Sequence, residues 1–102
     1  MFTKIYTLKF PSLNEAKIAV SYLSEEIGGS IAECNIASLS ILLDKEGTIT
    51  LMVRFDTMQE MQVFSSRKAK AMNDLKSSFP IRTTESAAVA VFTFDREATA
   101  TV

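Results

Sequence analysis

The chain has 102 residues, the usual length of one domain, and its 47% apolar and 23% charged residues exclude a disordered segment. With 11 basic and 12 acidic residues, the formal net charge of −1 excludes attraction to nucleic acid or an anionic membrane surface by bulk charge. We therefore expect residues 1–102 to form a single domain that binds neither nucleic acid nor membrane.

Two features bear on the compartment. Cys34 is the only cysteine, so the chain cannot form an internal disulfide bond. The N-terminus begins with an alternating pattern that lacks the basic and apolar regions of a signal peptide, and no apolar run approaches the roughly 20 residues of a membrane-spanning helix. The predicted location is the cytoplasm.

The first two predicted elements are a strand and a helix. Alternation over residues 2–10 predicts a strand with Phe2, Tyr6, Leu8 and Phe10 on one face and Thr3, Ile5, Thr7 and Lys9 on the other. Pro11 ends this strand, and Ser12 with Glu15 forms a capping box that opens a helix. We expect Gly28 and Gly29 to end the helix by adopting a positive φ angle.

A hairpin is predicted next. Ile36–Leu43 and Thr48–Phe55 are apolar runs joined by the turn residues Asp44-Lys45-Glu46-Gly47. The second run alternates, with Ile49, Leu51, Val53 and Phe55 on the side expected to join the core and Thr48, Thr50, Met52 and Arg54 on the other.

The last two predicted elements are a helix and a strand. Thr57 and Glu60 form a second capping box, and Pro80 prevents the helix from continuing. Lys68 interrupts the apolar stripe of this helix, so its stem is expected to lie along apolar surface while its ammonium group reaches water. Residues 87–94, apolar at nearly every position, predict a final strand with both faces covered.

This βαββαβ order favours an α+β split sandwich, with an antiparallel sheet in the order 4-1-3-2 and both helices on one face. The other face would carry Thr3, Ile5, Thr7, Thr50, Met52 and alternate residues of 87–94, with most charges near strand ends. Such a face is too apolar for a monomer and predicts a homodimer in which two copies cover the same patch, so that a charge at Met52 or Val91 would impair assembly. The alternative is a weakly polar exposed sheet, because threonine is an ordinary strand residue.

The βαββαβ order, the threonine-and-aliphatic second face and the C-terminal extension 98–102 resemble the dimeric α/β-barrel superfamily, whose subunits are ferredoxin-like. The resemblance covers nearly the whole chain. It implies a dimeric barrel, and the superfamily includes cofactor-independent monooxygenases of the antibiotic-biosynthesis type, haem-handling enzymes and stress-responsive proteins. Alternation in the extension also favours a strand that pairs with the partner's sheet edge, while Phe92 and Phe94 close the core.

The absence of histidine excludes Ser-His-Asp and Cys-His nucleophiles and a haem held by a proximal histidine. No glycine-rich phosphate loop is present, and a lone cysteine cannot build a thiolate zinc site, so we expect neither a metal nor a nucleotide cofactor. Cys34 is interpreted as a small buried apolar residue.

These exclusions leave a small apolar cavity, between helices and sheet or inside the paired barrel, with polar groups at its margin. The candidate ligand-binding residues are Tyr6, Tyr22, Arg54 and Arg82. Two functions remain open: a non-catalytic small-molecule-binding or interaction domain, and a cofactor-independent monooxygenase acting on a small aromatic or apolar substrate. An RNA-recognition module is a remote third alternative, because the third strand lacks that module's glycine-aromatic opening.

Overall fold

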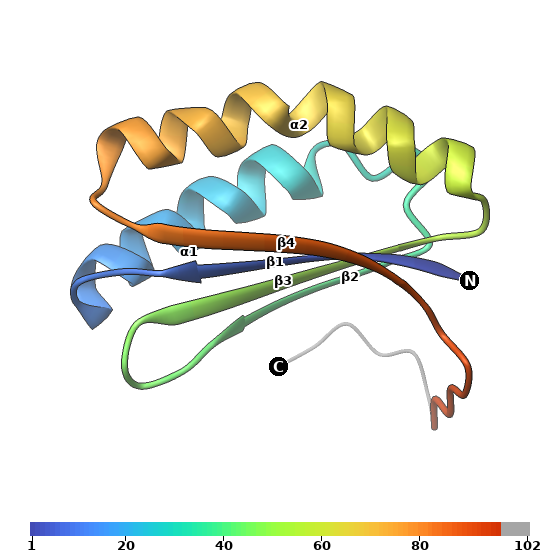
Figure 1. Ribbon diagram of the computed structural model, residues 1–102, viewed down its shortest axis with the longest axis horizontal. Coiled ribbons are helices and arrows are strands. Elements are labelled where there is room, and N and C mark those ends of the chain that lie inside the picture. The colour runs from blue at the N-terminus through green and yellow to red at the C-terminus, as the bar shows by residue number, and fades with distance from the viewer. Residues whose placement is uncertain (97–102) are drawn as a thin grey trace.

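The computed structural model describes residues 1–96. A single antiparallel sheet contains four strands, and two helices cover one of its faces (Figure 1). The elements run in the order β1 (Phe2–Lys9), α1 (Leu13–Gly28), β2 (Ser38–Leu43), β3 (Thr48–Phe55), α2 (Met58–Ser78) and β4 (Arg82–Val89). The strand order β2-β3-β1-β4 is the predicted order read from the opposite edge, so the predicted topology is confirmed.

Both helices begin at the predicted capping residues. The Ser12 side chain accepts a hydrogen bond from the Glu15 backbone N–H at 3.2 Å, and Thr57 and Glu60 make the complete reciprocal capping box. The expectation of a positive φ at the end of α1 is wrong, because Gly29 has a φ of −68°. Glycine is needed there for space, since a Cβ atom would lie 2.8 Å from the backbone oxygen of Glu25.

The core lies between the helices and the sheet, with α1 packed on β2 and β3 and α2 packed on β1 and β3. The predicted inner faces of β1 and β3 are confirmed. The largest side chains that are fully buried are Phe55, Phe64, Leu8, Leu23, Ile27, Ile49, Leu51 and Val53.

Lys68 is largely buried, and the structure adds a partner that was not predicted for its ammonium group. The Nζ atom lies 3.4 Å from Oε1 of Glu26, whose side chain is 41% exposed. The ion pair therefore links α2 to α1 at the point where a charge interrupts the apolar stripe. A buried ammonium group needs such a partner, because desolvation without one is costly.

The last strand was predicted about five residues too late. β4 occupies Arg82–Val89 and pairs with the full length of β1, from Arg82 opposite Lys9 to Val89 opposite Phe2. Beyond this pairing, the Ala90 N–H donates to the Met1 carbonyl oxygen at 2.9 Å. As an edge strand, β4 is mostly exposed, so the expectation of two covered faces is also wrong.

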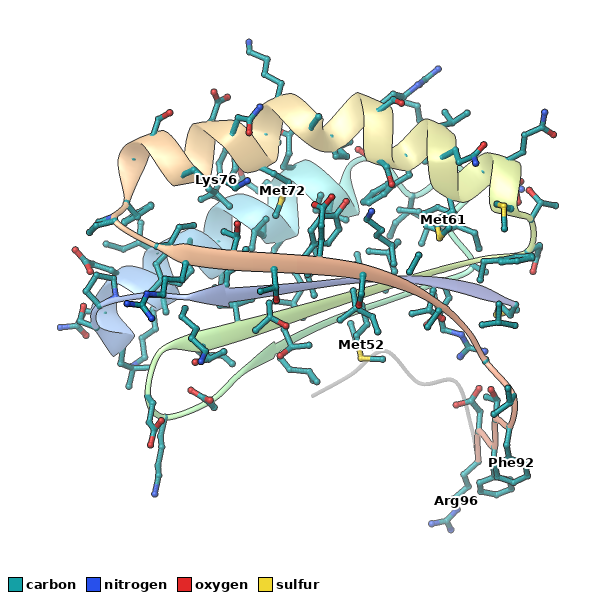
Figure 2. All side chains as sticks on the ribbon, viewed as in Figure 1. Met52, Met61, Met72, Lys76, Phe92 and Arg96 are labelled. Atoms are coloured by element: carbon teal, nitrogen blue, oxygen red, sulfur yellow. The ribbon has the colours of Figure 1, made fainter. Side chains whose placement is uncertain are left out.

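The sheet face opposite the helices, here called the open face, is defined by the strand register. It carries Ser38, Ser40, Leu42, Thr48, Thr50, Met52, Arg54, Thr3, Ile5, Thr7, Lys9, Arg82, Thr84, Ser86 and Ala88. Figure 2 shows Met52 on this side of the sheet and Met61 and Met72 on the helix side. The β1 and β3 members of the predicted face are confirmed, while its β4 members come from residues 82–88 in place of 87–94.

Residues 90–96 follow β4 and lie on the open side of the sheet (Figure 1). Phe92 is 86% exposed and Phe94 is 77% exposed, so the prediction that they close the core is wrong. Val91 also lies beyond the strand and belongs to no sheet face. The strand predicted for residues 98–102 falls outside the described residues.

Within residues 1–96, neither helix has the length and apolar character that crossing a membrane requires.

Candidate functional site

Three hollows lie near three of the four residues predicted to bind ligand. Tyr22 borders a groove between the two helices, Tyr6 borders a cleft between α2 and the sheet, and Arg54 borders a hollow on the open face. Arg82 is exposed at the far end of the open face and lines none of these three. The structure therefore does not bring the four residues together into one site.

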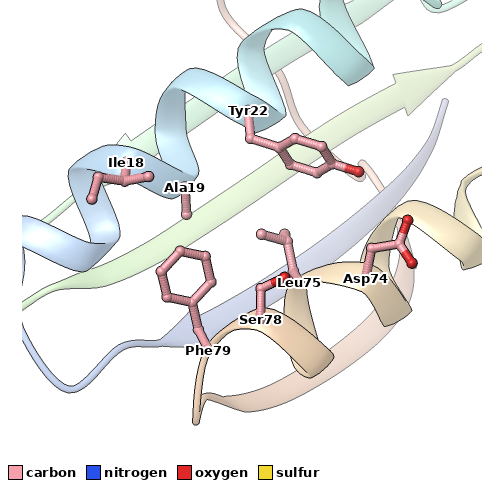
Figure 3. A pocket seen from close by; sticks show the side chains of 7 residues that line it. All are labelled: Ile18, Ala19, Tyr22, Asp74, Leu75, Ser78 and Phe79. Carbon is pink, nitrogen blue, oxygen red and sulfur yellow. The ribbon is translucent and has the colours of Figure 1, made fainter.

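The groove between α1 and α2 has a volume of about 320 Å³ and is mainly apolar. Figure 3 shows Ile18, Ala19 and Tyr22 on α1 facing Leu75 and Phe79, with Asp74 on the α2 side beside the Tyr22 ring. Partial burial, followed by the negative charges of Glu26 and Asp74, raises the pKa of the Tyr22 phenol. The groove is open to solvent along its length, because Ile18 and Tyr22 are both exposed.

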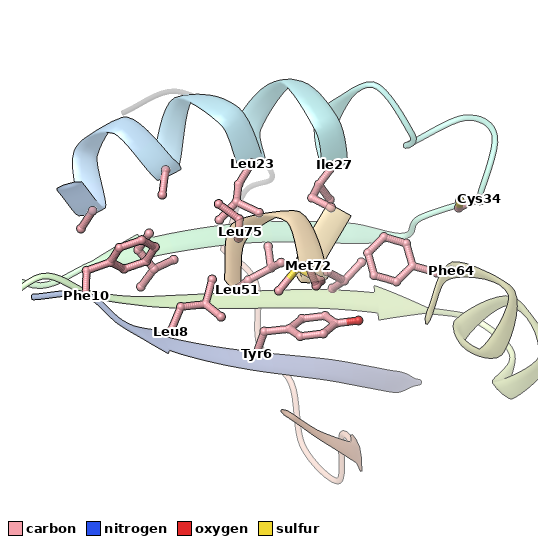
Figure 4. Close-up of a cluster of buried hydrophobic side chains, with 14 of the residues drawn as sticks. Tyr6, Leu8, Phe10, Leu23, Ile27, Cys34, Leu51, Phe64, Met72 and Leu75 are labelled. Carbon is pink, nitrogen blue, oxygen red and sulfur yellow. The ribbon is translucent and has the colours of Figure 1, made fainter. Parts of the chain in front are cut away.

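The cleft beside Tyr6, here called the Tyr6 cleft, is smaller and more polar. It has a volume of about 180 Å³ and is lined by Tyr6 and Glu85 from the sheet and, from α2, by Ser65, Ala69, Met72, Asn73 and Lys76. Alternation along β1 points the Tyr6 ring toward the helices, where Figure 4 shows it beside Met72 in the core. A phenol, an amide, an ammonium group and a carboxylate thus meet at the edge of an apolar core.

Burial raises the pKa of the Tyr6 phenol to about 12, the negative charge of Glu85 adds to the rise, and the polar Ser65 hydroxyl opposes it. Tyr6 is therefore a neutral hydrogen-bond donor at physiological pH. Lys4 stabilises this arrangement from the same strand face. Its Nζ atom lies 3.6 Å from Oε1 of Glu85 and 5.6 Å from the centre of the Tyr6 ring, a cation–π distance.

Sequence reasoning identified Tyr6 but missed Lys4, Glu85 and the α2 residues of the cleft. The alternation of β1 carried a signal for Lys4, because a residue two positions before Tyr6 shares its face. Glu85 could be identified only from the pairing of β1 with β4, which places it directly opposite Tyr6. Because the last strand was predicted too late in the chain, Glu85 was outside it.

The hollow beside Arg54 has a volume of about 270 Å³ and lies between the open face and the segment that follows β4. Thr3, Ile5, Met52 and Ala88 form its sheet side, and Phe92 belongs to the segment. The Arg54 side chain is 22% exposed, and its Nη1 atom lies 4.0 Å from Oδ2 of Asp95. The hollow is thus an apolar surface with a cation at one end.

Cys34 is buried in the loop between α1 and β2, as its interpretation as a small apolar residue requires. Across residues 1–96, no group of three or more histidine, cysteine, aspartate or glutamate side chains is arranged to hold a metal ion.

Comparison with solved structures decides the fold. A proposed antibiotic biosynthesis monooxygenase of Deinococcus radiodurans matches with a TM-score of 0.78 and 16% identity, over 96% of this chain and 100% of the other. A dimeric ferredoxin-like protein from an uncultured marine organism matches with a TM-score of 0.69 and 18% identity, over 94% of this chain and 100% of that protein. The chain has a ferredoxin-like fold.

A third solved neighbour is the monooxygenase from the gene ActVA-Orf6 of Streptomyces coelicolor, in complex with the ligand nanaomycin D. It has a TM-score of 0.67 and 14% identity, over 92% of each chain. No family model and no curated protein matches the sequence. The resemblance drawn from the sequence is confirmed at the level of the ferredoxin-like fold, because identities this low carry the fold and not the activity.

Proposed function

We propose that the protein is a homodimer built through the open face of its sheet, and that each subunit binds a small molecule in the Tyr6 cleft. The observation that carries the dimer is the composition of the open face. Its middle holds threonine, serine, Ile5 and Met52, and its charges, Lys9, Arg82 and Arg54, lie toward the strand ends. An isologous contact would cover this patch on both copies at once.

The segment after β4 supports the same surface. Val91, Phe92 and Phe94 are 96%, 86% and 77% exposed, respectively, on the open side of the sheet. Three large, solvent-exposed apolar side chains beside a weakly charged face are typical of a surface that is buried in a protein–protein interface. Two of the solved neighbours are themselves described as dimeric ferredoxin-like proteins.

The dimer can be tested by placing one charge on each side of the sheet. Met52→Lys puts an ammonium group on the open face between Ile5 and Ser40, whereas Met58→Lys makes the same chemical change at the exposed start of α2. Light scattering over a dilution series should show dimers for the parent and for Met58→Lys, and an association weakened by about tenfold or more for Met52→Lys. A parent that stays monomeric at high micromolar concentration would refute the proposed dimer.

The small-molecule site is proposed for the Tyr6 cleft because its polar groups converge on one space. The neutral Tyr6 phenol and Lys76 can donate to an oxygen atom of a ligand, while Glu85 can accept. The volume of about 180 Å³ suits the polar end of a small ligand, since pockets for drug-sized ligands start at roughly 300 Å³. Cytoplasmic location stays a prediction from the sequence.

A second candidate function is cofactor-independent monooxygenation of a small electron-rich aromatic substrate. The specific observation in its favour is a neutral phenol held in a cleft at the edge of the apolar core, which would orient a substrate oxygen while the core side of the cleft excludes water. Two solved neighbours of the same fold are described as monooxygenases, one of them by proposal.

Oxygen consumption with small dihydroxy-aromatic compounds, measured in the presence of a chelator, distinguishes the enzyme from the binding protein. For an enzyme we expect turnover that Tyr6→Phe reduces and Tyr22→Phe leaves unchanged, because Tyr22 lies in the separate groove between the helices. Binding to the Tyr6 cleft without oxygen consumption would support the binding protein. Equal turnover in the parent and Tyr6→Phe would refute the role given to the cleft.

A further inference from the structure

The charged side chains of the open face in the four described strands are all positive. They are Lys9 and Arg82, which lie opposite each other at one end, and Arg54 at the other end. No aspartate or glutamate occupies an open-face position in the four described strands, although the whole chain has a net charge of −1. In a dimer made through this face, the cations of both subunits would share one enclosed surface, where like charges repel unless an anion compensates them.

Arg54 is the most buried of these cations. Only 22% of its side chain is exposed, and its Nε atom is buried with no hydrogen-bond partner in the described part of the chain. The carboxylate of Asp95 is 71% exposed and lies 4.0 Å from Nη1, beyond hydrogen-bond length. A buried donor of a charged group without an acceptor is costly, so the surroundings of Arg54 favour an additional anionic acceptor.

The hollow that Arg54 lines is suited to an apolar body. The hollow of about 270 Å³ is bordered by Ile5, Met52 and Ala88 on the sheet and by Phe92 on the segment after β4. We propose that this hollow binds a small organic carboxylate, with the carboxylate on Arg54 and an apolar or aromatic body between the open face and Phe92. The inference deepens the proposed dimer, which would enclose the ligand, but the hollow is already complete within one subunit.

A set of three naphthalene probes separates charge from shape: 1-naphthoate, the 1-naphthylmethylammonium ion and 1-naphthylmethanol. Calorimetric titration of the full chain should show binding of the carboxylate and weaker binding of the other two. Arg54→Gln should raise the Kd of naphthoate by about tenfold or more, because it removes a charge-assisted hydrogen bond. Arg67→Gln removes the same charge from an exposed arginine of α2, which forms an ion pair with Glu33 of the loop between α1 and β2, and should leave this Kd unchanged.

Methyl spectra of the methionines give a second readout that does not depend on any variant folding. Naphthoate should shift the Met52 methyl signal, while Met61 and Met72, which lie on the helix side, stay in place (Figure 2). Equal binding of the three probes, an unchanged Kd in a folded Arg54→Gln, or shifts confined to Met61 and Met72 would overturn the carboxylate site.

The oligomeric state measured in the same samples separates the two proposals. Naphthoate binding through Arg54 by a monomer would refute the dimer and leave the carboxylate site standing. A stable dimer without Arg54-dependent binding would refute the carboxylate site alone.

Discussion

Replacing Tyr6 with phenylalanine should remove one pH dependence of stability. The Tyr6 pKa is raised from 10.0 to about 12 in the folded protein, first by burial and then by the negative charge of Glu85. The unfolded chain loses this phenolic proton near pH 10, whereas the folded chain keeps it until about pH 12. The contribution of Tyr6 to stability is therefore complete below about pH 10 and is lost as the pH rises toward 12.

The expected magnitude follows from the difference of about two pH units. Each unit corresponds to about 1.4 kcal/mol, so the complete loss is at most about 2.7 kcal/mol, and about half of it has occurred near pH 11. The phenylalanine side chain of Tyr6→Phe cannot ionise, so this variant lacks the pH-dependent loss of stability. The free energy of unfolding should thus fall by about 1.4 kcal/mol less for Tyr6→Phe than for the parent between about pH 8 and pH 11.

Urea unfolding at the two pH values measures this difference, and Tyr22→Phe is the matched control that keeps Tyr6. The chain has two tyrosines and no tryptophan, so the near-ultraviolet phenolate absorbance of Tyr22→Phe reports Tyr6 alone. We expect this absorbance to increase only when the pH is raised well above 10. A Tyr6 phenolate that forms near pH 10 while the chain is still folded would refute the reasoning.

Three further predictions concern stability, each measured by denaturant unfolding. Gly28→Ala should stabilise the fold by about 0.4–1 kcal/mol, because a Cβ atom there meets nothing within 4 Å. Gly47→Ala should destabilise the fold, because φ is +92° and the Cβ atom would lie 2.9 Å from the Ser12 carbonyl oxygen. A Gly47→Ala variant that is more stable than Gly28→Ala would contradict both predictions. Thr57→Ala removes a capping box and should lower the free energy of unfolding by about 1 kcal/mol. An unchanged denaturation midpoint would show that the cap does not stabilise the fold. Phe64→Ala empties a fully buried site against Phe55 and should cost about 3–5 kcal/mol, which a loss below about 1 kcal/mol would contradict.

Local patterns were enough to predict most of the fold. The alternation of β1 and β3 identified which residues face the helices, because the side-chain period of a strand is two. Ser12 and Thr57 predicted both helix starts, because a cap satisfies backbone donors within three residues of itself. The same reasoning identified Tyr6 as an inward-facing residue before its surroundings were known.

The placement of β4 was not accessible to such local reasoning. The apolar run of residues 87–94 looked like a buried strand, while the actual strand contains Thr83, Thr84 and Glu85. An edge strand can carry polar residues, and its position depends on the partner strand and not on its own hydrophobicity. β4 starts soon after Pro80, and its last residue, Val89, pairs with Phe2, the first residue of β1.

The sequence by itself determined the element order, the inward faces of β1 and β3 and the weak charge of the open face, since these depend on neighbours a few residues apart. Only the tertiary structure decided the grouping of functional residues. It put Glu85 beside Tyr6, paired Lys68 with Glu26, and separated Tyr22 from Arg54 by the whole thickness of the sheet. These contacts join residues far apart in the chain, and their geometry is set by strand register and helix packing, which no local pattern encodes.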